Sequence, residues 1–150
     1  MRIADILRSK GSAVATVTET TTVRGLLGEL AIQNIGAMVV IGPDPGDCAG
    51  GVVGIVSERD VVRELHEQGP DLLRRTVGEI MSTVVVTCSP DDHIDDLTAV
   101  MTNNRIRHVP VLQGGRLAGI VSIGDVVKHR MDELQAERAQ LQAYITQGGA

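Results

Sequence analysis

One segment of this chain occurs twice with almost the same residues. Residues 54–62 read GIVSERDVV and residues 119–127 read GIVSIGDVV, an offset of 65 (119 − 54). Apolar positions upstream of each segment also repeat, for example Leu26 with Leu97, at an offset of 71 (97 − 26). A sequence that repeats itself at a fixed distance predicts two copies of one supersecondary unit. The two copies most simply pack against each other.

The length of the chain favours one compact body. Its 150 residues divide into halves of roughly 65 to 75 residues, and halves of that size are marginally stable on their own. We therefore expect a single core that both copies share. A hydrophobic content of 43% with 22% charged residues is typical of a soluble globular protein, and no apolar run approaches the roughly 18 residues that a membrane-spanning helix needs.

Charge and aromatic content restrict the partners. The net charge of −5 argues against binding to nucleic acid or to an anionic membrane, because both need a basic surface. The chain has no Trp, no Phe and a lone tyrosine, so it offers no aromatic platform on which unpaired bases could stack. The first residues lack the apolar stretch of a secretory signal, which predicts a cytoplasmic protein. Cys48 and Cys88 have no metal-ligand spacing, and we expect reduced, free thiols.

Hydrophobic periodicity places the elements of both copies in the same order. In the first copy we expect a helix at 3–7, a strand at 13–17, a helix at 23–35, strands at 37–41 and 52–56, and a helix at 57–68. In the second copy we expect a helix at 77–81, a strand at 84–87, a helix at 94–104, strands at 108–112 and 117–121, and a helix from Ser122. The Gly- and Pro-rich segment 42–51 is expected to be a loop.

This order of elements predicts a mixed α/β (α+β) fold in which helices cover small sheets and a pseudo-twofold axis relates the copies. The first copy spans 1–68, a linker 69–75, the second copy 76–130, and an extended C-terminal helix with a tail 131–150. Neither copy has the glycine spacing of a Rossmann or P-loop nucleotide site.

The last helix is longer than its counterpart in the first copy. Its apolar residues recur at spacings of four and three, with Arg138 in one of these positions, which is typical of a coiled-coil seam. The apolar residues of this seam are Val127, Met131, Leu134, Leu141 and Ile145. They could pack back on their own chain or on a second copy. We expect a homodimer, because the other faces of 132–142 are too polar to be internal.

The repeated Ser-x-x-Asp has two readings. Serine followed by an acid three residues later, directly before a helix, is close to a capping box, in which both side chains bond the helix N-terminus. The same groups suit a ribonucleotide, since a carboxylate can accept hydrogen bonds from both hydroxyls of a ribose. The serine hydroxyl and the helix N-terminal amides favour a phosphate oxygen. Nearby cations such as Arg59, Arg107, Arg105 and Lys128 would then hold the anionic end of the ligand.

Motifs around these boxes resemble the cystathionine-β-synthase (CBS) domain family in its paired form, the Bateman module. They are VGEIM at 77–81, RIRHVPV at 105–111 and the two Gly-apolar-apolar-Ser-x-x-Asp segments. Their duplicated order covers most of the chain. The resemblance implies a regulatory, non-catalytic module that binds adenosine nucleotides (AMP, ADP, ATP, sometimes NAD or S-adenosylmethionine) in clefts between the repeats. It also implies signalling to a regulated partner protein.

The resemblance further implies the residues of two clefts, each built from both copies. Cleft A would consist of Lys10, Ala15, Ile35, Gly36, Ile120, Ser122 and Asp125. Cleft B would consist of Met81, Val86, Ile106, Arg107, Ile55, Ser57, Arg59 and Asp60. His108 points from a strand start toward these clefts. Gly36 and Gly124 stand where cleft B has Arg107 and Arg59, so we expect phosphate to bind more strongly in cleft B.

The residues do not indicate an enzyme. A hydrolase needs a nucleophile with a base and an orienting group, or a metal cluster, and we recognise neither in the sequence. The acids at 91–96 are explained by the dipole of the helix that follows them, without a cation. The alternative to a nucleotide-binding module is an oligomerisation or scaffold module without a ligand, in which the Ser-x-x-Asp boxes are only helix caps.

Overall fold

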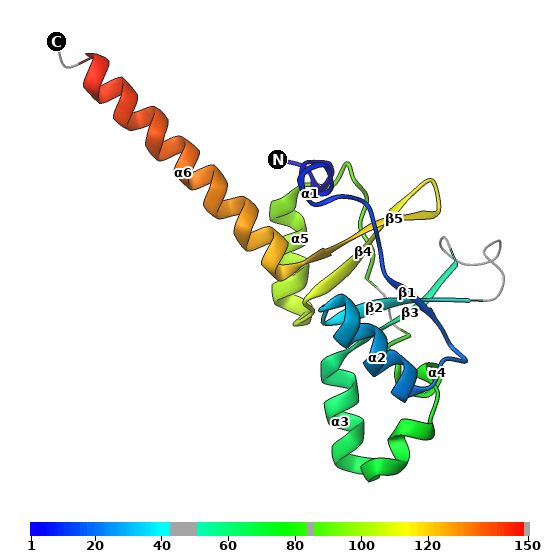
Figure 1. Cartoon of the computed structure of the whole chain (residues 1–150). Coiled ribbons are helices and arrows are strands. Elements are labelled where there is room, and N and C mark those ends of the chain that lie inside the picture. The colour runs from blue at the N-terminus through cyan, green and yellow to red at the C-terminus, as the bar shows by residue number, and fades with distance from the viewer. Residues whose placement is uncertain (43–50, 84–85, 149–150) are drawn as a thin grey trace.

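The computed structural model describes residues 1–42, 51–83 and 86–148. The first half of the chain contains α1 (Ile3–Lys10), β1 (Thr16–Thr18), α2 (Val23–Gln33), β2 (Ala37–Ile41), β3 (Val52–Ser57) and α3 (Glu58–Gln68). The second half contains the 3-10 helix η2 (Gly69–Arg74), α4 (Val77–Ile80), α5 (Ile94–Asn104), β4 (His108–Gln113), β5 (Arg116–Ser122) and α6 (Ile123–Gly148). The fold is mixed α/β, as the order of elements predicts (Figure 1).

Each copy forms its own small sheet. In the first, β1 pairs parallel to β2 and β2 pairs antiparallel to β3. In the second, β4 and β5 form an antiparallel hairpin. The two registers are equivalent, since Ala37 lies opposite Ser57 in one sheet and His108 lies opposite Ser122 in the other. The start of β2 and the start of β4 therefore each lie beside a Ser-x-x-Asp box.

Helix α2, which precedes β2, and helix α5, which precedes β4, end in the same way. Asn34 after α2 and Arg105 after α5 both have a φ of 53°, a left-handed conformation that commonly ends helices. Their backbone N–H groups bond back to carbonyls of the last helical turn. The expected helix at 23–35 is wrong at its end for this reason, because α2 ends at Gln33 and Ile35 lies beyond the turn. The expected helix at 94–104 is confirmed.

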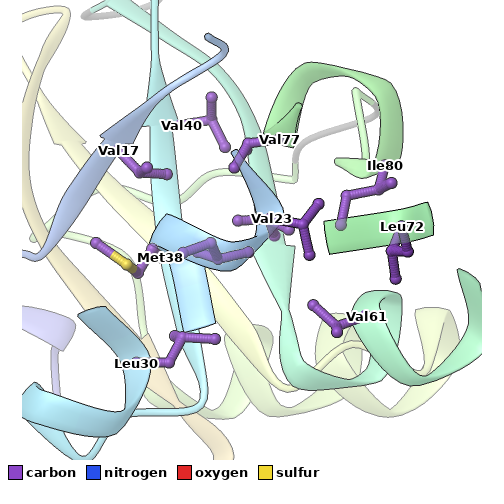
Figure 2. Close-up of a cluster of buried hydrophobic side chains, with 11 residues drawn as sticks. Val17, Val23, Leu30, Met38, Val40, Val61, Leu72, Val77 and Ile80 are labelled. Atoms are coloured by element: carbon purple, nitrogen blue, oxygen red, sulfur yellow. The ribbon is translucent and has the colours of Figure 1, made fainter. Parts of the chain in front are cut away.

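The expectation of a single core is wrong, because the buried side chains form two clusters. The first cluster lies under the three-stranded sheet and contains Val17, Val23, Leu26, Leu30, Met38, Val40, Val56, Val61, Leu72, Val77 and Ile80 (Figure 2). The second cluster lies under the hairpin and contains Ile3, Ile6, Cys88, Ile94, Leu97, Met101, Val109, Val111, Val121 and Val126. Each small sheet has its own apolar face, and each face needs its own cover.

Each cluster contains residues of both copies, because the copies exchange their first helices. Ile3 and Ile6 of α1 are buried in the second cluster, and Val77 and Ile80 of α4 are buried in the first. Backbone hydrogen bonds fix the exchange: the N–H of Ile3 donates to Asp92 O at 3.0 Å, and the N–H of Val77 donates to Thr21 O at 2.8 Å. The packing units therefore differ from the repeats in the sequence.

Two glycines of the repeated segment make room for the exchanged helices. A Cβ at Gly54 would lie 2.7 Å from Met81 Sδ, and a Cβ at Gly119 would lie 2.6 Å from Leu7 Cδ2. Contacts that short do not occur between real side chains. At Gly54 the added Cβ would also lie 2.7 Å from the backbone oxygen of Ser82, so a larger residue there would push the neighbouring chain away. At Gly119 it would meet only the side chain of Leu7, which can shift.

Two of the expected strands differ from the structure, and the expected linker stays a prediction. The strand expected at 13–17 is β1 at Thr16–Thr18, because only these residues lie opposite β2. The linker expected at 69–75 contains η2, and its Leu72 is fully buried in the first cluster. In the strand expected at 84–87, residues 84–85 lie outside the described residues, Val86 and Thr87 are irregular, and Cys88 forms one bridge to Val111. The expected loop at 42–51 falls mostly outside the described residues, as does Cys48.

The terminal helix α6 leaves the body of the molecule as a single rod (Figure 1). Val126 is buried, but every described residue from Leu134 onward is exposed. The apolar seam therefore does not pack back on its own chain. Among the described residues, no helix combines the length and the apolar character required to cross a membrane. The cytoplasmic location stays a prediction.

Candidate functional site

The two copies meet at the starts of β2 and β4. Ala37 opens β2 and His108 opens β4, and the boxes that follow β3 and β5 lie directly across from them. A cavity lies on each side of this junction. Each is lined by residues from both copies, so neither cavity would exist in one copy alone.

Cleft B has a volume of about 380 Å³, which is within the range of small-molecule sites. Its lining residues are Gly36, Ala37, Ile55, Ser57, Glu58, Arg59, Asp60, Arg63, Ser82, Val86, Arg105, Ile106, Arg107, His108 and Pro110. Apolar side chains form its walls and charged side chains form its rim. This is the combination that a flat, partly apolar ligand with an anionic group requires.

The Ser-x-x-Asp box of cleft B forms a helix cap. Asp60 Oδ2 accepts hydrogen bonds from the backbone N–H of Ser57 at 2.9 Å and from its hydroxyl at 3.2 Å. The other oxygen of Asp60 accepts one from Arg63 at 2.8 Å. The capping reading of the box is therefore correct for this structure. It does not exclude a ribose, since each carboxylate oxygen can accept more than one hydrogen bond.

Three arginines of cleft B are free to bind an anion. Arg59, Arg105 and Arg107 line the cavity and are exposed. Within the described part of the chain they have no carboxylate partner, in contrast to Arg63, which pairs with Asp60. Guanidinium groups bind phosphate through two parallel hydrogen bonds. The rim of cleft B therefore carries three arginines without an ion pair among the described residues, against one lining carboxylate, Glu58, that is likewise without one.

Cleft A lies on the other side of the junction, with a volume of about 430 Å³. Its lining residues are Lys10, Ala13, Val14, Ala15, Gln33, Ile35, Gly36, Ala37, His108, Ile120 and Ser122. Lys10, the one lysine or arginine among these lining residues, is already bonded: its Nζ lies 2.6 Å from Asp125 Oδ2 and 2.8 Å from the carbonyl of Ile120. Cleft A thus lacks the free cations of cleft B.

The carboxylate of Asp125 is held ionised by its bonds. Burial raises its pKa, but hydrogen bonds from Lys10 and from both the backbone and the side chain of Ser122 outweigh burial and lower the pKa below its usual value. The backbone N–H of Ser122 donates to Asp125 Oδ2 at 2.8 Å, and the backbone N–H of Asp125 donates to Ser122 Oγ at 3.1 Å. The second box is therefore also a complete cap.

His108 lies in the wall between the two clefts. Together with Gly36 and Ala37 it lines both cavities. Burial lowers the pKa of His108, and so do the cations Lys10 and Arg107, while Asp125 and Glu58 act in the opposite direction. Two of these charged groups belong to the side of cleft A and two to the side of cleft B. The charge on His108 is consequently sensitive to both clefts.

The structure brings most of the expected site residues together. Cleft A contains the expected residues except Asp125, which bonds Lys10 and Ser122 at its edge without lining it. Cleft B contains the expected residues except Met81. Met81 does not line the cavity, because its side chain packs on Gly54 and on the first cluster. Leu7 takes the equivalent position in the other half.

Sequence reasoning missed several lining residues. In cleft B these include Glu58, Arg63, Ser82 and Pro110, and in cleft A Ala13, Val14 and Gln33. A signal existed for Arg63, because it follows Asp60 by three residues and lies on the same helix face. Ser82 had no such signal, since its place depends on the exchange of α4 between the copies.

Other candidate chemistry is limited. Among the described residues, no group of three or more His, Cys, Asp or Glu side chains is arranged to hold a metal ion. Cys88 is a free cysteine, as expected, and burial raises the pKa of its thiol to about 12, with a further contribution from Asp92. A thiol with so high a pKa is unreactive at neutral pH.

The fold and the paired clefts define a tandem α/β repeat with cavities between its two copies, and comparison with known proteins identifies its family. The sequence model of the CBS domain matches residues 3–67 and 77–132. The chain therefore belongs to the CBS domain family, as a tandem pair. It is 35% identical over 153 residues to the CBS domain-containing protein CBSX3, mitochondrial, of Arabidopsis thaliana, an alignment that covers 98% of this chain and 72% of the relative.

Solved structures of CBS-domain proteins have the same fold as this chain. The CBS-domain containing protein ATU1752 from Agrobacterium tumefaciens has 43% sequence identity and a TM-score of 0.80, and the match covers 86% of this chain and 92% of that one. The CBS domain pair of protein MJ0100, solved with 5′-methylthioadenosine and S-adenosyl-L-methionine, has 24% identity and a TM-score of 0.73, covering 89% and 98%. The last similarity concerns the fold alone.

Proposed function

We propose that this protein is a non-catalytic regulatory module that binds an adenosine nucleotide between its two CBS repeats and passes the signal to a partner protein. Cleft B is the main nucleotide site in this proposal. Ile55, Val86 and Ile106 contact the base, Asp60 accepts from the ribose, and the arginines bind the phosphate. The ligand is AMP, ADP, ATP or NAD.

The observation that carries the proposal is the set of three arginines on a partly apolar cavity. A protein with a net charge of −5 gathers Arg59, Arg105 and Arg107 at one rim without carboxylate partners among the described residues. Like charges gathered in this way repel one another unless an anion lies between them. The MJ0100 pair, which has the same fold, accommodates adenosine ligands, and this supports an adenosine ligand here.

Cleft A differs in charge and is proposed to bind more weakly. Its Lys10 is bonded to Asp125, and Gly36 and Gly124 supply no cation where cleft B has arginines. A phosphate in cleft A would have to compete with a carboxylate for Lys10. We therefore expect cleft A to prefer an adenosine ligand with little or no negative charge.

Titration calorimetry with AMP tests this proposal. The intact protein should show a tighter and a weaker site, and Arg107→Ala should remove the tighter one, because a charged hydrogen bond contributes roughly 1.5–3 kcal/mol, about ten- to a hundred-fold in affinity. Asp60→Ala should weaken the same site. Arg116→Ala is the matched control: this arginine lies at the turn of the hairpin, at the opposite end from His108 and Ser122.

The second candidate is a scaffold module without a ligand, and the completed caps at both boxes favour it. A thermal-shift series with AMP, ADP, ATP, NAD and S-adenosylmethionine separates the two. A ligand at ~100 times its dissociation constant should add about 2.7 kcal/mol to the stability of the folded protein. Two equal AMP sites that both survive Arg107→Ala would contradict the assignment of cleft B. No stabilisation by any of the five would leave the scaffold function.

We also propose that the module is a homodimer in which α6 takes part, since the seam from Val127 to Ile145 is exposed in the single chain. A chain that ends at Arg130 should then be a weaker dimer in sedimentation velocity experiments. The cytoplasmic location that we expect from the sequence stays part of this proposal.

A further inference from the structure

The ring of His108 lies between the two cavities and is not bonded to the rest of the described chain. It lines cleft A and cleft B together with Gly36 and Ala37. The position that a Cβ of Gly36 would take lies 4.0 Å from Cε1 of the ring, so the ring lies beside a residue that has no side chain. Among the described residues, no buried side-chain nitrogen lacks a hydrogen-bond partner. The unbonded ring nitrogens are therefore open to the cavities and to a ligand.

The repeat places a histidine at this junction only once. Ala37 is the counterpart of His108, because the two residues open β2 and β4 and lie opposite the serines of the two boxes. An alanine has no group that titrates, and its small side chain leaves room at the junction. A single imidazole can therefore respond to what occupies either side.

Charged groups from four elements act on this ring. They are Lys10 at the end of α1, Asp125 in α6, Arg107 directly before β4, and Glu58 at the start of α3. Lys10 and Asp125 pair with each other at 2.6 Å, so their effects on the ring largely cancel. Arg107 and Glu58 line cleft B and have no ion pair among the described residues. The other charged residues that line the cavities are Arg59, Arg105 and the bonded pair Asp60 and Arg63.

An anion in cleft B would change this balance of charge. Burial lowers the pKa of His108, and Lys10 and Arg107 lower it further against Asp125 and Glu58, so the structure favours the neutral ring. A phosphate monoester carries a charge of about −1.5 to −2 at pH 7. An opposite charge within about 4–6 Å favours the charged form of a group and shifts its pKa by roughly one to three units. A phosphate at the rim of cleft B thus acts on the ring in the direction opposite to burial.

We infer that His108 binds a proton when a phosphorylated ligand occupies cleft B and then acts as a further cation toward the phosphate. The inference rests on the proposed nucleotide function and adds a determinant of its specificity. Cleft B gains positive charge only for a ligand that brings negative charge, and an adenosine without phosphate meets a neutral ring. The proton also offsets the carboxylate of Glu58, whose Oε2 lies 3.7 Å from the same Cβ position at Gly36.

Titration calorimetry of the full chain with AMP measures this proton. Titrations at pH 6, 7 and 8, each in two buffers of different ionisation enthalpy, give the number of protons taken up per AMP bound. The wild type should take up more protons than His108→Gln at pH 6 and pH 7, and the same number at pH 8. The phosphate of AMP titrates near pH 6 itself, but it does so with both proteins and drops out of the difference. The affinity ratio of wild type to variant should rise about three- to tenfold from pH 8 to pH 6.

Two controls accompany this titration. His66→Gln removes an exposed histidine on α3 and should take up as many protons as the wild type. Adenosine, which lacks the phosphate, should cause no uptake that depends on His108. An NMR titration of the wild type needs no substitution: of the four imidazoles in the chain, one should titrate at higher pH when AMP is bound.

The ways in which the inference could fail are distinguishable. AMP binding with equal proton uptake in the wild type and His108→Gln, and with no imidazole shifted in the NMR titration, would overturn the role of His108 and leave the nucleotide function standing. Equal uptake with adenosine and with AMP would overturn the link to the phosphate. Absence of AMP binding at all three pH values would overturn the role of His108 together with the proposed AMP site.

Discussion

At the scale of single residues, His108 is the side chain on which both clefts act. Its ring lines each cavity, and its pKa is lowered by burial and then by Lys10 and Arg107. An imidazole with a lowered pKa stays neutral in the folded protein at a pH where the unfolded chain already binds a proton. Folding then becomes less favourable as the pH falls below the ordinary value of 6.5.

This gives a prediction for pH dependence. Between pH 8 and pH 5.5, measured by urea unfolding, the wild type should lose more stability than His108→Gln, which has no proton to exclude. His66→Gln, an exposed substitution on α3, should behave as the wild type. The pH range stops above pH 5 so that Asp125 does not contribute to the difference. The pKa of Asp125 in the folded protein is lowered from its ordinary value of 3.8. Its stabilising effect is therefore complete above pH 3.8 and is lost only at lower pH. An equal loss in all three proteins would show that His108 is hydrated in the folded state.

The residues of the site could be predicted where the chemistry is carried by the repeat itself. Ser57, Asp60, Ser122 and Asp125 were found because they recur at one offset in both copies. Met81 does not line cleft B for a physical reason: its contact with Gly54 makes it the equivalent of Leu7 in the other half. Helix α1 continues to Lys10 whereas α4 ends at Ile80, so one offset does not serve both the helix and the strand that follows. The sequence does carry a signal for the offset of the helix, because residues 3–7 read IADIL and residues 77–81 read VGEIM.

At the scale of elements, η2 shows that the connection between the copies is part of the core. Leu72 is fully buried among residues of α2, α3 and α4, while its neighbour Leu73 is 38% exposed. Leu72→Ala should therefore lower the free energy of unfolding by roughly 2–5 kcal/mol, the usual cost of a cavity in a packed core. Leu73→Ala is the matched control and should change it by less than about 1 kcal/mol. Chemical denaturation measures both, and equal effects would mean that η2 is a passive linker.

Most elements could be predicted from periodicity, and those that could not depend on contacts between distant segments. The helix at Ile94–Asn104 has a regular apolar face, which is a local signal, whereas the left-handed conformation of Arg105 after it is not one that an arginine predicts. The short strand β1 depends on how far it lies opposite β2. The helical linker depends on a pocket for Leu72 that α4 helps to build. The number of clusters also depends on contacts between distant segments. The sequence does not say which copy receives which first helix, so it does not predict two clusters instead of one.

At the scale of the whole molecule, the exchanged helices make the halves interdependent. Fragment 1–75 lacks Val77 and Ile80 of its cluster, and fragment 76–150 lacks Ile3 and Ile6 of the other. We expect neither fragment alone, at concentrations where it does not self-associate, to unfold cooperatively by circular dichroism. An equimolar mixture should regain the cooperative transition of the intact chain. A sharp transition in one isolated fragment would mean that the exchanged helix is dispensable for that cluster.

The exchange of α1 and α4 also bears on how such a chain could arise. Both helices fill equivalent places beside Gly119 and Gly54, so a shorter ancestor with one copy could have completed its core only by lending its first helix to an identical molecule. Domain swapping of this kind is a low-cost route to a symmetric dimer. Joining the two swapped molecules end to end would preserve every contact while freeing each half to mutate separately. The difference between the two clefts, with Arg59 and Arg107 on one side and Gly124 and Gly36 on the other, is of the kind that a fused chain permits and two identical molecules do not.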